Sequence, residues 1–303
     1  MARKHENTSR SLVILAFACV YFFWGSTFVA IRVGVQSLSP AFVSGFRYCA
    51  AGVIMLTVLA LRSVRIVLPR AEFQRALLLG VVMLTGNNVM ISWAEQSLSA
   101  GLAALLAAAI PLMIALAETF IPGGTPLNRM GWFGTVIGFV GLIVLLAPLL
   151  GGGVGSASTG VVIMLVADLL WVVGSLYSGR KPSQVDPLLG AGWQMLLGGT
   201  LSIVLGSALG GWQSAHWNKS ALLAVLWLIV FGSLVGYTAY MWLLHHVPVA
   251  KVATYAYVNP IVSVALSSLL LHESLHGSQW IAMAIILASV ALVTASKSKP
   301  KAA

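Results

Sequence analysis

Ten long apolar runs, separated by short polar connections, make up almost the whole chain. A helix needs about 20 apolar residues to cross the hydrocarbon core of a bilayer, and each run is close to this length. We therefore predict an all-α integral membrane protein with ten transmembrane helices. Their approximate bounds are 11–33, 40–61, 74–94, 98–121, 130–149, 159–179, 188–209, 220–244, 249–271 and 278–296.

The polar connections carry most of the charge, and their charges predict the orientation of the helices. Lys and Arg gather at the cytoplasmic ends of membrane helices. If the N-terminus is cytoplasmic, every Lys and Arg lies at a cytoplasmic helix end except Lys219, Arg32 and Arg47. The distribution of basic residues therefore predicts that both termini are cytoplasmic.

The composition supports a lipid environment rather than a nucleic-acid partner. The chain is 59% hydrophobic and 8% charged, whereas soluble domains carry roughly 25% charged residues. A net charge of +10 could indicate nucleic-acid binding. Because the basic residues alternate with apolar runs, we interpret them as orientation signals and expect the bilayer as partner and no nucleic acid.

The two halves of the chain resemble each other. Pro111 and Pro260 lie 260 − 111 = 149 residues apart, and the same offset superimposes Trp93 on Trp242. Each half holds five predicted helices, an odd number, so the second half must enter the membrane upside down. Such inverted repeats are common in transporters, with the substrate site near the midplane between the halves. The predicted repeats span 11–150 and 158–297.

Three segments resemble the EamA-type drug/metabolite transporter superfamily. They are Trp24-Gly25-Ser26-Thr27, Tyr257-Val258-Asn259-Pro260, and the stretch from Leu271-His272-Glu273 to Gln279-Trp280. The resemblance covers the whole chain and is greatest for the branch of bacterial inner-membrane permeases that includes amino-acid exporters. It implies ten helices in two inverted repeats and export of small metabolites. The first half departs from this pattern, because 122–125 lacks the expected Glu at the helix end.

Pro111 and Pro260 predict helix breaks within two membrane-length runs. Proline lacks an N–H and leaves a carbonyl without its helical partner, which lipid tolerates only beside protein or water. Tyr255 and Asn259 share one helical face at Pro260, together with Lys251 and Ser263. The matching face at Pro111 is apolar. We therefore predict that Tyr255 and Asn259 contact the substrate.

Charged residues near or within the apolar runs are candidates for coupling. A charge inside a membrane helix costs about 3 kcal/mol or more. Asp168 and Arg47 lie at similar depths, about 13 Å and about 10 Å from the outer end of their helices at 1.5 Å per residue. The alternatives are a structural Arg47–Asp168 ion pair or a proton or substrate-ammonium site at Asp168. Glu95 is a third candidate and could meet Arg32.

Aromatic and polar side chains at similar depths complete the predicted site. Trp24, Trp171 and Tyr237 lie too deep to be interface anchors, and Asn88 and Ser92 share a polar helical face. Core packing and interhelical hydrogen bonding are the alternatives for these residues. An aromatic wall with few charges suits a neutral or zwitterionic organic molecule.

The remaining features of the sequence limit the classes of function that are possible. No catalytic constellation, metal-ligand array or phosphate-binding Gly-Lys-Ser/Thr loop is present, so we expect no enzyme, no metal and no cofactor. The predicted function is a secondary exporter of amino acids or related compounds in the bacterial cytoplasmic (inner) membrane, as a monomer or homodimer. The alternatives are an uncoupled facilitator or channel and a non-transporting assembly subunit.

Overall fold

The computed structural model describes residues 10–150, 155–247, 252, 254–275 and 277–298, and this part of the chain is helical without strands. It holds nine stretches long and apolar enough to span a membrane. A shorter apolar helix, Tyr255–Leu271, replaces most of the run predicted at 249–271. Lys251 lies outside the described residues. The spanning stretches are Arg10–Gly34, Pro40–Leu61, Arg70–Ala94, Ala100–Phe120, Arg129–Ala147, Ala157–Arg180, Pro187–Ala208, Lys219–Leu243 and Gly277–Ser296.

Three of these stretches contain a π-helical segment, which the sequence pattern did not indicate. A π-helical turn holds extra residues and often marks a functional site. Segments η2 and η3 begin 228 − 80 = 148 residues apart, close to the predicted repeat offset. The inverted orientation of the two halves remains a prediction. The segments are α1 (Arg10–Cys19), η1 (Val20–Trp24) and α2 (Gly25–Gly34); α4 (Arg70–Leu79), η2 (Gly80–Asn87) and α5 (Asn88–Ala94); and α12 (Lys219–Trp227), η3 (Leu228–Val235) and α13 (Gly236–His246).

The predicted break at Pro111 is confirmed. Helix α6 (Ala100–Ala107) ends four residues before Pro111, and α7 (Ile110–Phe120) begins after a short turn. The Ala107 carbonyl would need the N–H that Pro111 lacks, so the α-helix stops there.

The predicted break at Pro260 is wrong in its position. Pro260 lies inside α15 (Tyr255–Leu271), and the chain turns before this helix, at Thr254. The N–H that Pro260 lacks would have bonded the carbonyl of Ala256 in the first turn of α15. Only this one helical bond is lost, so the helix continues.

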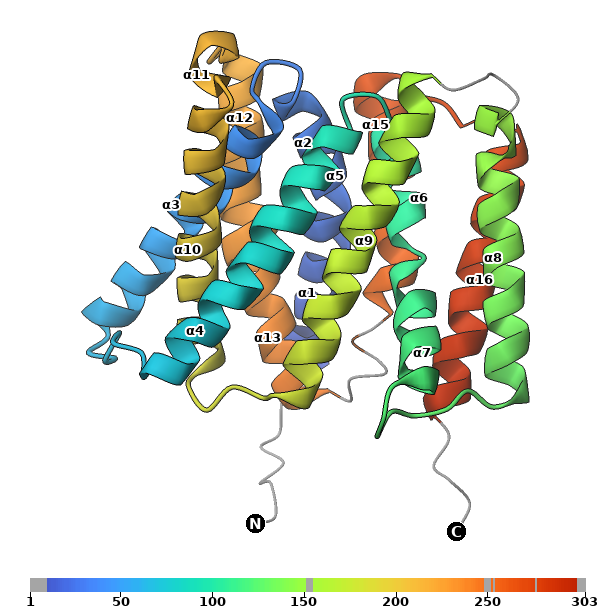
Figure 1. Cartoon of the computed structure of the whole chain (residues 1–303), viewed down its shortest axis with the longest axis horizontal. Helices are drawn as coiled ribbons and strands as arrows, with labels where there is room; N and C mark the ends of the chain where they lie inside the picture. Colours follow the sequence, from blue (N-terminus) through green and yellow to red (C-terminus); the bar gives the residue numbers. More distant parts are fainter. Residues whose placement is uncertain (1–9, 151–154, 248–251, 253, 276, 299–303) are drawn as a thin grey trace.

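The bundle is held together by helix pairs that join the two halves. Helix α3 (Pro40–Leu61) packs against α10 (Pro187–Ala208), and α8 (Arg129–Leu150) packs against α16 (Gly277–Ser298) (Figure 1). Gly199 allows the closest approach, because a Cβ there would lie 2.1 Å from the backbone nitrogen of Cys49. Small residues permit such backbone contact between membrane helices.

The ends of the bundle can be told apart by their connections. Helix α1 begins and α16 ends at the lower end in Figure 1, which we call the termini face. The α5–α6 and α15–α16 connections lie at the other end, which we call the opposite face. The helices not yet named are α9 (Ser156–Arg180) and α11 (Gly211–Ser214).

Candidate functional site

Four aromatic side chains from three helical stretches meet inside the bundle. The Trp24 ring lies 5.0 Å from that of Tyr240 and 5.2 Å from that of Tyr255, measured between centroids, and Tyr237 lies 6.4 Å from Tyr240. Trp24 Nε1 also donates to the Gly232 carbonyl at 3.1 Å. We call Trp24, Tyr237, Tyr240 and Tyr255 the aromatic cluster. Three of its members were predicted site residues. Tyr240 was not, although it follows Tyr237 at helical spacing.

Polar groups border the aromatic cluster where α15 begins. The hydroxyls of Tyr21 and Thr254 are 2.5 Å apart. With its side-chain amide assigned in the orientation that turns the nitrogen toward these acceptors, Asn259 donates to the carbonyls of Tyr21 at 3.1 Å and Tyr255 at 3.2 Å. These bonds hold the start of α15 against η1. Thr254 was missed by sequence reasoning because nothing in the local pattern indicates the turn that brings it here.

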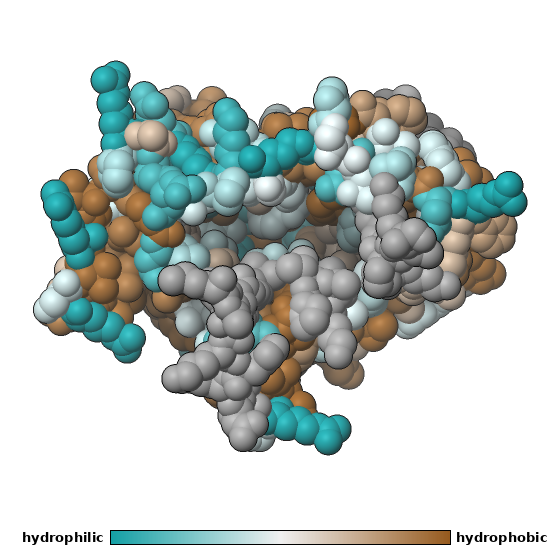
Figure 2. Space-filling model, turned by 90° about the horizontal axis from the view of Figure 1, so that it is seen from below, coloured by the Kyte–Doolittle hydropathy of each residue, from teal (hydrophilic) through white to brown (hydrophobic). Residues whose placement is uncertain are grey.

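The aromatic cluster is not fully buried. Each of its four members is only half-buried, and Trp24 lies in the middle of a membrane-length helical stretch. Viewed from the termini face, the molecule is hollowed near its centre, with polar residues at depth (Figure 2). Aromatic walls with a few polar groups are typical of sites for small organic molecules.

A buried guanidinium lies beside this cluster without a carboxylate partner in the described chain. Arg47 is 7% exposed, and its Nε donates to Ser233 Oγ at 2.9 Å. Its guanidinium carbon lies 4.6 Å from the centre of the Tyr48 ring. A Cβ on Gly232 would lie 3.2 Å from Arg47 Nη2. Because the Gly232 carbonyl accepts from Trp24, the guanidinium and the aromatic cluster share one neighbour on η3.

The Arg47–Asp168 ion pair, one of the two alternatives for these residues, does not form. Asp168 is fully buried, and neither of its carboxylate oxygens has a hydrogen-bond partner among the described residues. Its helix, α9, packs against α5, η2, α6 and α7, whereas Arg47 lies on α3 and reaches η3. Equal depth in the membrane therefore did not imply contact, because the two residues lie on helices with different neighbours.

Asn88 and Ser92 connect helices. Tyr48 Oη donates to Asn88 Oδ1 at 2.8 Å, and the hydroxyls of Ser44 and Ser92 are 3.3 Å apart. These contacts join α3 to α5, as the alternative interpretation of interhelical bonding proposed. Trp171 is half-buried on α9, and within the described part of the chain no ring contact joins it to the aromatic cluster.

Arg32 meets Glu95 only through the main chain. Arg32 Nη1 donates to the Glu95 carbonyl oxygen, whereas Arg32 Nε pairs with Glu273 Oε1 at 3.2 Å. The Glu95 carboxylate is fully buried and has no hydrogen-bond partner in the part of the chain that the structure describes. Arg32 does meet Glu95, but its ion pair is with Glu273, a residue from the other half of the chain.

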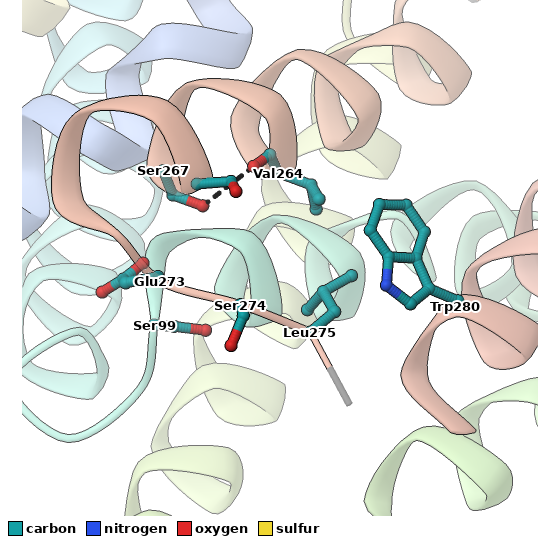
Figure 3. A pocket seen from close by; sticks show the side chains of 8 residues that line it. Ser99, Val264, Ser267, Glu273, Ser274, Leu275 and Trp280 are labelled. Atoms are coloured by element: carbon teal, nitrogen blue, oxygen red, sulfur yellow. Dashed lines mark hydrogen bonds between the residues drawn. The ribbon is translucent and has the colours of Figure 1, made fainter. Parts of the chain in front are cut away.

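A small cavity lies at the opposite face, beside Glu273. Its volume is about 80 Å³, and Ser99, Ser267, Ser274 and Trp280 are among the residues that line it (Figure 3). Sites for organic ligands occupy roughly 300–1,000 Å³, so this cavity suits water. Across the described residues, no group of three or more His, Cys, Asp or Glu could hold a metal ion.

Comparisons with known proteins agree with this architecture. The EamA-like transporter family matches residues 11–147 and 158–295. The inner membrane transporter YedA of Escherichia coli (strain K12) is 34% identical over 284 residues, which are 93% of this chain and 90% of YedA. The transporter YoaV of Bacillus subtilis (strain 168) is 22% identical over 87% of this chain and 90% of its own length. One crystal structure covers 96% of this chain and 100% of its own with a TM-score of 0.68, and its 20% identity supports the fold alone.

Proposed function

This chain belongs to the EamA-like transporter family, and on that premise we propose that it exports amino acids or related neutral or zwitterionic metabolites. Export crosses the bacterial cytoplasmic (inner) membrane by alternating access, with both termini in the cytoplasm. The YedA relative, an inner membrane transporter by name, supports the location. The hollow at the termini face would then open toward the cytoplasm, from which an exporter takes its substrate.

The observation that carries the substrate class is the buried Arg47 beside the aromatic cluster. A buried cation without a counter-ion is costly, and a carboxylate is the partner that a guanidinium binds best. The carboxylate of an amino acid would supply that partner. The rings of Trp24, Tyr240 and Tyr255, which are in mutual contact, would then contact the rest of the molecule.

The proposal is tested by a substrate screen on the purified full-length protein. Thermal shifts and counterflow in proteoliposomes are measured for amino acids, their carboxamides, nucleosides and amphipathic drugs. We expect amino acids to exchange and their carboxamides to exchange poorly, since the amide cannot pair with Arg47. Trans-stimulation identifies a carrier, and its absence would identify a facilitator or channel. Neither a shift nor exchange with any compound would refute the exporter proposal.

Asn259→Ala is expected to reduce counterflow about tenfold and Tyr257→Phe by less than about threefold. Asn259 contributes two hydrogen bonds at the start of α15, each worth about 1 kcal/mol. Tyr257 turns away from the aromatic cluster, and its hydroxyl donates to the Val290 carbonyl on α16 at 3.2 Å. Initial rates at equal protein incorporation give the order. The reverse order would exclude Asn259 from the site.

We assign Asp168 to proton coupling, and Asp168→Asn is expected to uncouple transport. A buried carboxyl group without a hydrogen-bond partner is stable only in its protonated form. Asp168 would therefore release its proton when the surrounding helices open to water. The Asn side chain keeps the shape of the protonated acid but cannot release a proton. Transport driven by a pH gradient should fall roughly tenfold while counterflow continues. Loss of counterflow as well would indicate a substrate-ammonium site, and unchanged pH dependence would leave Asp168 a structural role.

A further inference from the structure

An ion pair at the opposite face ties the two halves of the chain together. Arg32, in the last turn of α2, pairs through Nε with Glu273 Oε1 at 3.2 Å, and Glu273 follows the end of α15. Glu273 Oε2 accepts from the Ala100 backbone nitrogen at 2.9 Å, at the start of α6. Ser263 on α15 donates to the Ala100 carbonyl at 3.1 Å. We call the pair and its contacts at Ala100 the Arg32–Glu273 clamp.

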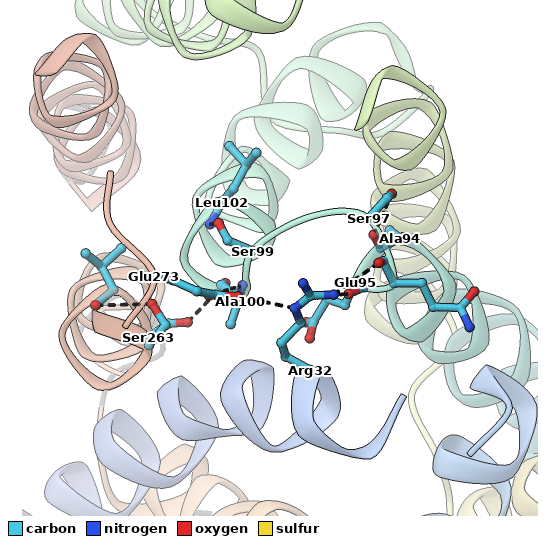
Figure 4. Close-up of polar contacts among 12 residues, drawn as sticks. Arg32, Ala94, Glu95, Ser97, Ser99, Ala100, Leu102, Ser263 and Glu273 are labelled. Carbon is cyan, nitrogen blue, oxygen red and sulfur yellow. Dashed lines mark hydrogen bonds and ion pairs between the residues drawn. The ribbon is translucent and has the colours of Figure 1, made fainter. Parts of the chain in front are cut away.

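The same arginine holds the end of α5. Arg32 Nη1 donates to the carbonyl oxygens of Glu95 and, at 3.1 Å, Gln96. Figure 4 shows Arg32 lying between Glu273 on one side and Glu95 on the other. Opening the clamp would therefore release α2, α5, α6 and the end of α15 from one another at this face. Alternating access requires such a release on each side of the membrane in turn.

Among the described residues at the clamp, Glu95 is the one acidic side chain without a hydrogen-bond partner. It is 0% exposed, and neither carboxylate oxygen accepts a hydrogen bond within the described chain. The charges that act on it are those of Arg32 and Glu273. Helix α9 packs against this end of α5 through Gly160, which carries no charge. Glu95 lies just beyond the spanning stretch, and burial raises the pKa of its carboxyl well above the usual range, against the smaller opposing effect of Arg32.

We propose that Glu95 is a proton-binding site that keeps the Arg32–Glu273 clamp closed for as long as it carries its proton. The proposal rests on the alternating-access transport proposed above. In the closed clamp the Glu95 side chain is buried without a hydrogen-bond donor. This conformation therefore stabilises the neutral acid form of Glu95 much more than the carboxylate. An open clamp lets water hydrate the carboxylate. By linkage, a conformation that binds the proton more tightly is favoured by protonation.

The proton exchanges with water at the opposite face. Gln96, the next residue, is exposed, and the 80 Å³ cavity beside Glu273 is large enough for water. Deprotonation releases one proton to this water and leaves a carboxylate that stabilises the open clamp. Reprotonation from the same side closes it. In an exporter with cytoplasmic termini, a proton taken from outside would therefore close the outer face after the substrate has left.

The test measures the distance across the clamp at different pH values without any substrate. Spin labels are attached at Gln36→Cys, after α2, and Gly277→Cys, at the start of α16, in a protein whose Cys19 and Cys49 are replaced by Ala. Both labelled positions are exposed, and a side chain at Gly277 meets open space. Between about pH 5 and about pH 9, a range that includes documented buried glutamates, we expect the ratio of short to long distances to fall on the order of tenfold.

Three variants test whether Glu95, and not another acidic residue, causes the change in distance with pH. Glu95→Gln should keep the short distance at every pH, and Glu273→Gln should favour the long distance at every pH. Glu72→Gln is the matched control, because Glu72 bonds Ser183 and Gln184 far from the clamp, where α4 begins. It should retain the wild-type response.

Two results would overturn the proposal. If the distance in the wild-type protein does not change with pH, the clamp does not depend on a proton. If the distance in Glu95→Gln still changes with pH, another group is responsible. Since no transport is measured, a protein that exchanges no metabolite but shows these distance changes would refute the proposed substrate class and leave the clamp supported.

Discussion

Arg47→Gln lowers amino-acid counterflow on the order of a hundredfold and barely changes the already poor exchange of the matching carboxamide. The expected loss follows from removing charge-assisted hydrogen bonds to a carboxylate, which contribute roughly 1.5–3 kcal/mol. Arg47 is positioned for such bonds by Ser233 and by the ring of Tyr48. Initial rates at low substrate concentration, for the acid and the amide in both proteins, give the four values of a double-mutant cycle.

Stability distinguishes this role of Arg47 from a structural one. A buried guanidinium without a counter-ion costs folding free energy, so Arg47→Gln should leave the unfolding temperature unchanged or raise it. Arg47→Lys keeps the charge but loses the planar fork of donors and should recover only part of the exchange. Equal losses for the acid and the amide, or a marked fall in unfolding temperature, would show that Arg47 supports the fold and not the substrate carboxylate.

Gly199→Ala destabilises the whole bundle by about 3 kcal/mol, at the upper end of typical overpacking costs. The new Cβ would lie 2.1 Å from the backbone nitrogen of Cys49 and 2.7 Å from its Cα. Both atoms belong to the main chain of α3, so no side-chain rotation relieves the clash. The helices must move apart, and α3 also carries Arg47. We expect the unfolding temperature of the detergent-solubilised protein to fall by roughly 5–10 °C and transport to fall with it.

Gly190→Ala on the same helix is the matched control. The nearest atom to a Cβ at Gly190 is 3.9 Å away, an ordinary van der Waals contact. Alanine is also a better helix former than glycine by about 1 kcal/mol, so this variant should be as stable as the parent protein or more stable. If Gly199→Ala were equally harmless, the close packing of α3 on α10 would not be what limits stability.

Helix boundaries could be predicted closely because one physical quantity, the hydrophobicity along the chain, governs them. The prediction for 40–61 coincides with α3, and that for 188–209 differs from α10 by one residue at each end. In lipid every backbone group must bond within its own helix, so an apolar run of membrane length has one available structure. The π-helical segments were not predictable in this way, because hydrophobicity does not record the i to i+5 bonding pattern.

Sequence reasoning selected aromatic residues that do meet in the structure, but it could not identify the partners of the charged residues. Trp24, Tyr237 and Tyr255 were selected for their aromatic character and depth, and they meet in the aromatic cluster. Arg47 and Asp168 were correctly seen as charges within apolar runs. Their pairing was wrong because depth along a helix says nothing about which helix lies beside it.

The sequence by itself determined that this chain is a membrane protein of helical hairpins with a resemblance to a transporter family, since hydrophobicity and motif residues are local properties. Only the tertiary structure decided which polar groups have partners. It pairs Arg32 with Glu273 across 241 residues, places Arg47 beside Ser233, and leaves Glu95 and Asp168 without hydrogen-bond partners among the described residues. Whether a buried charge is compensated depends on contacts a few ångströms long between distant segments, and those contacts exist only once the helices have packed.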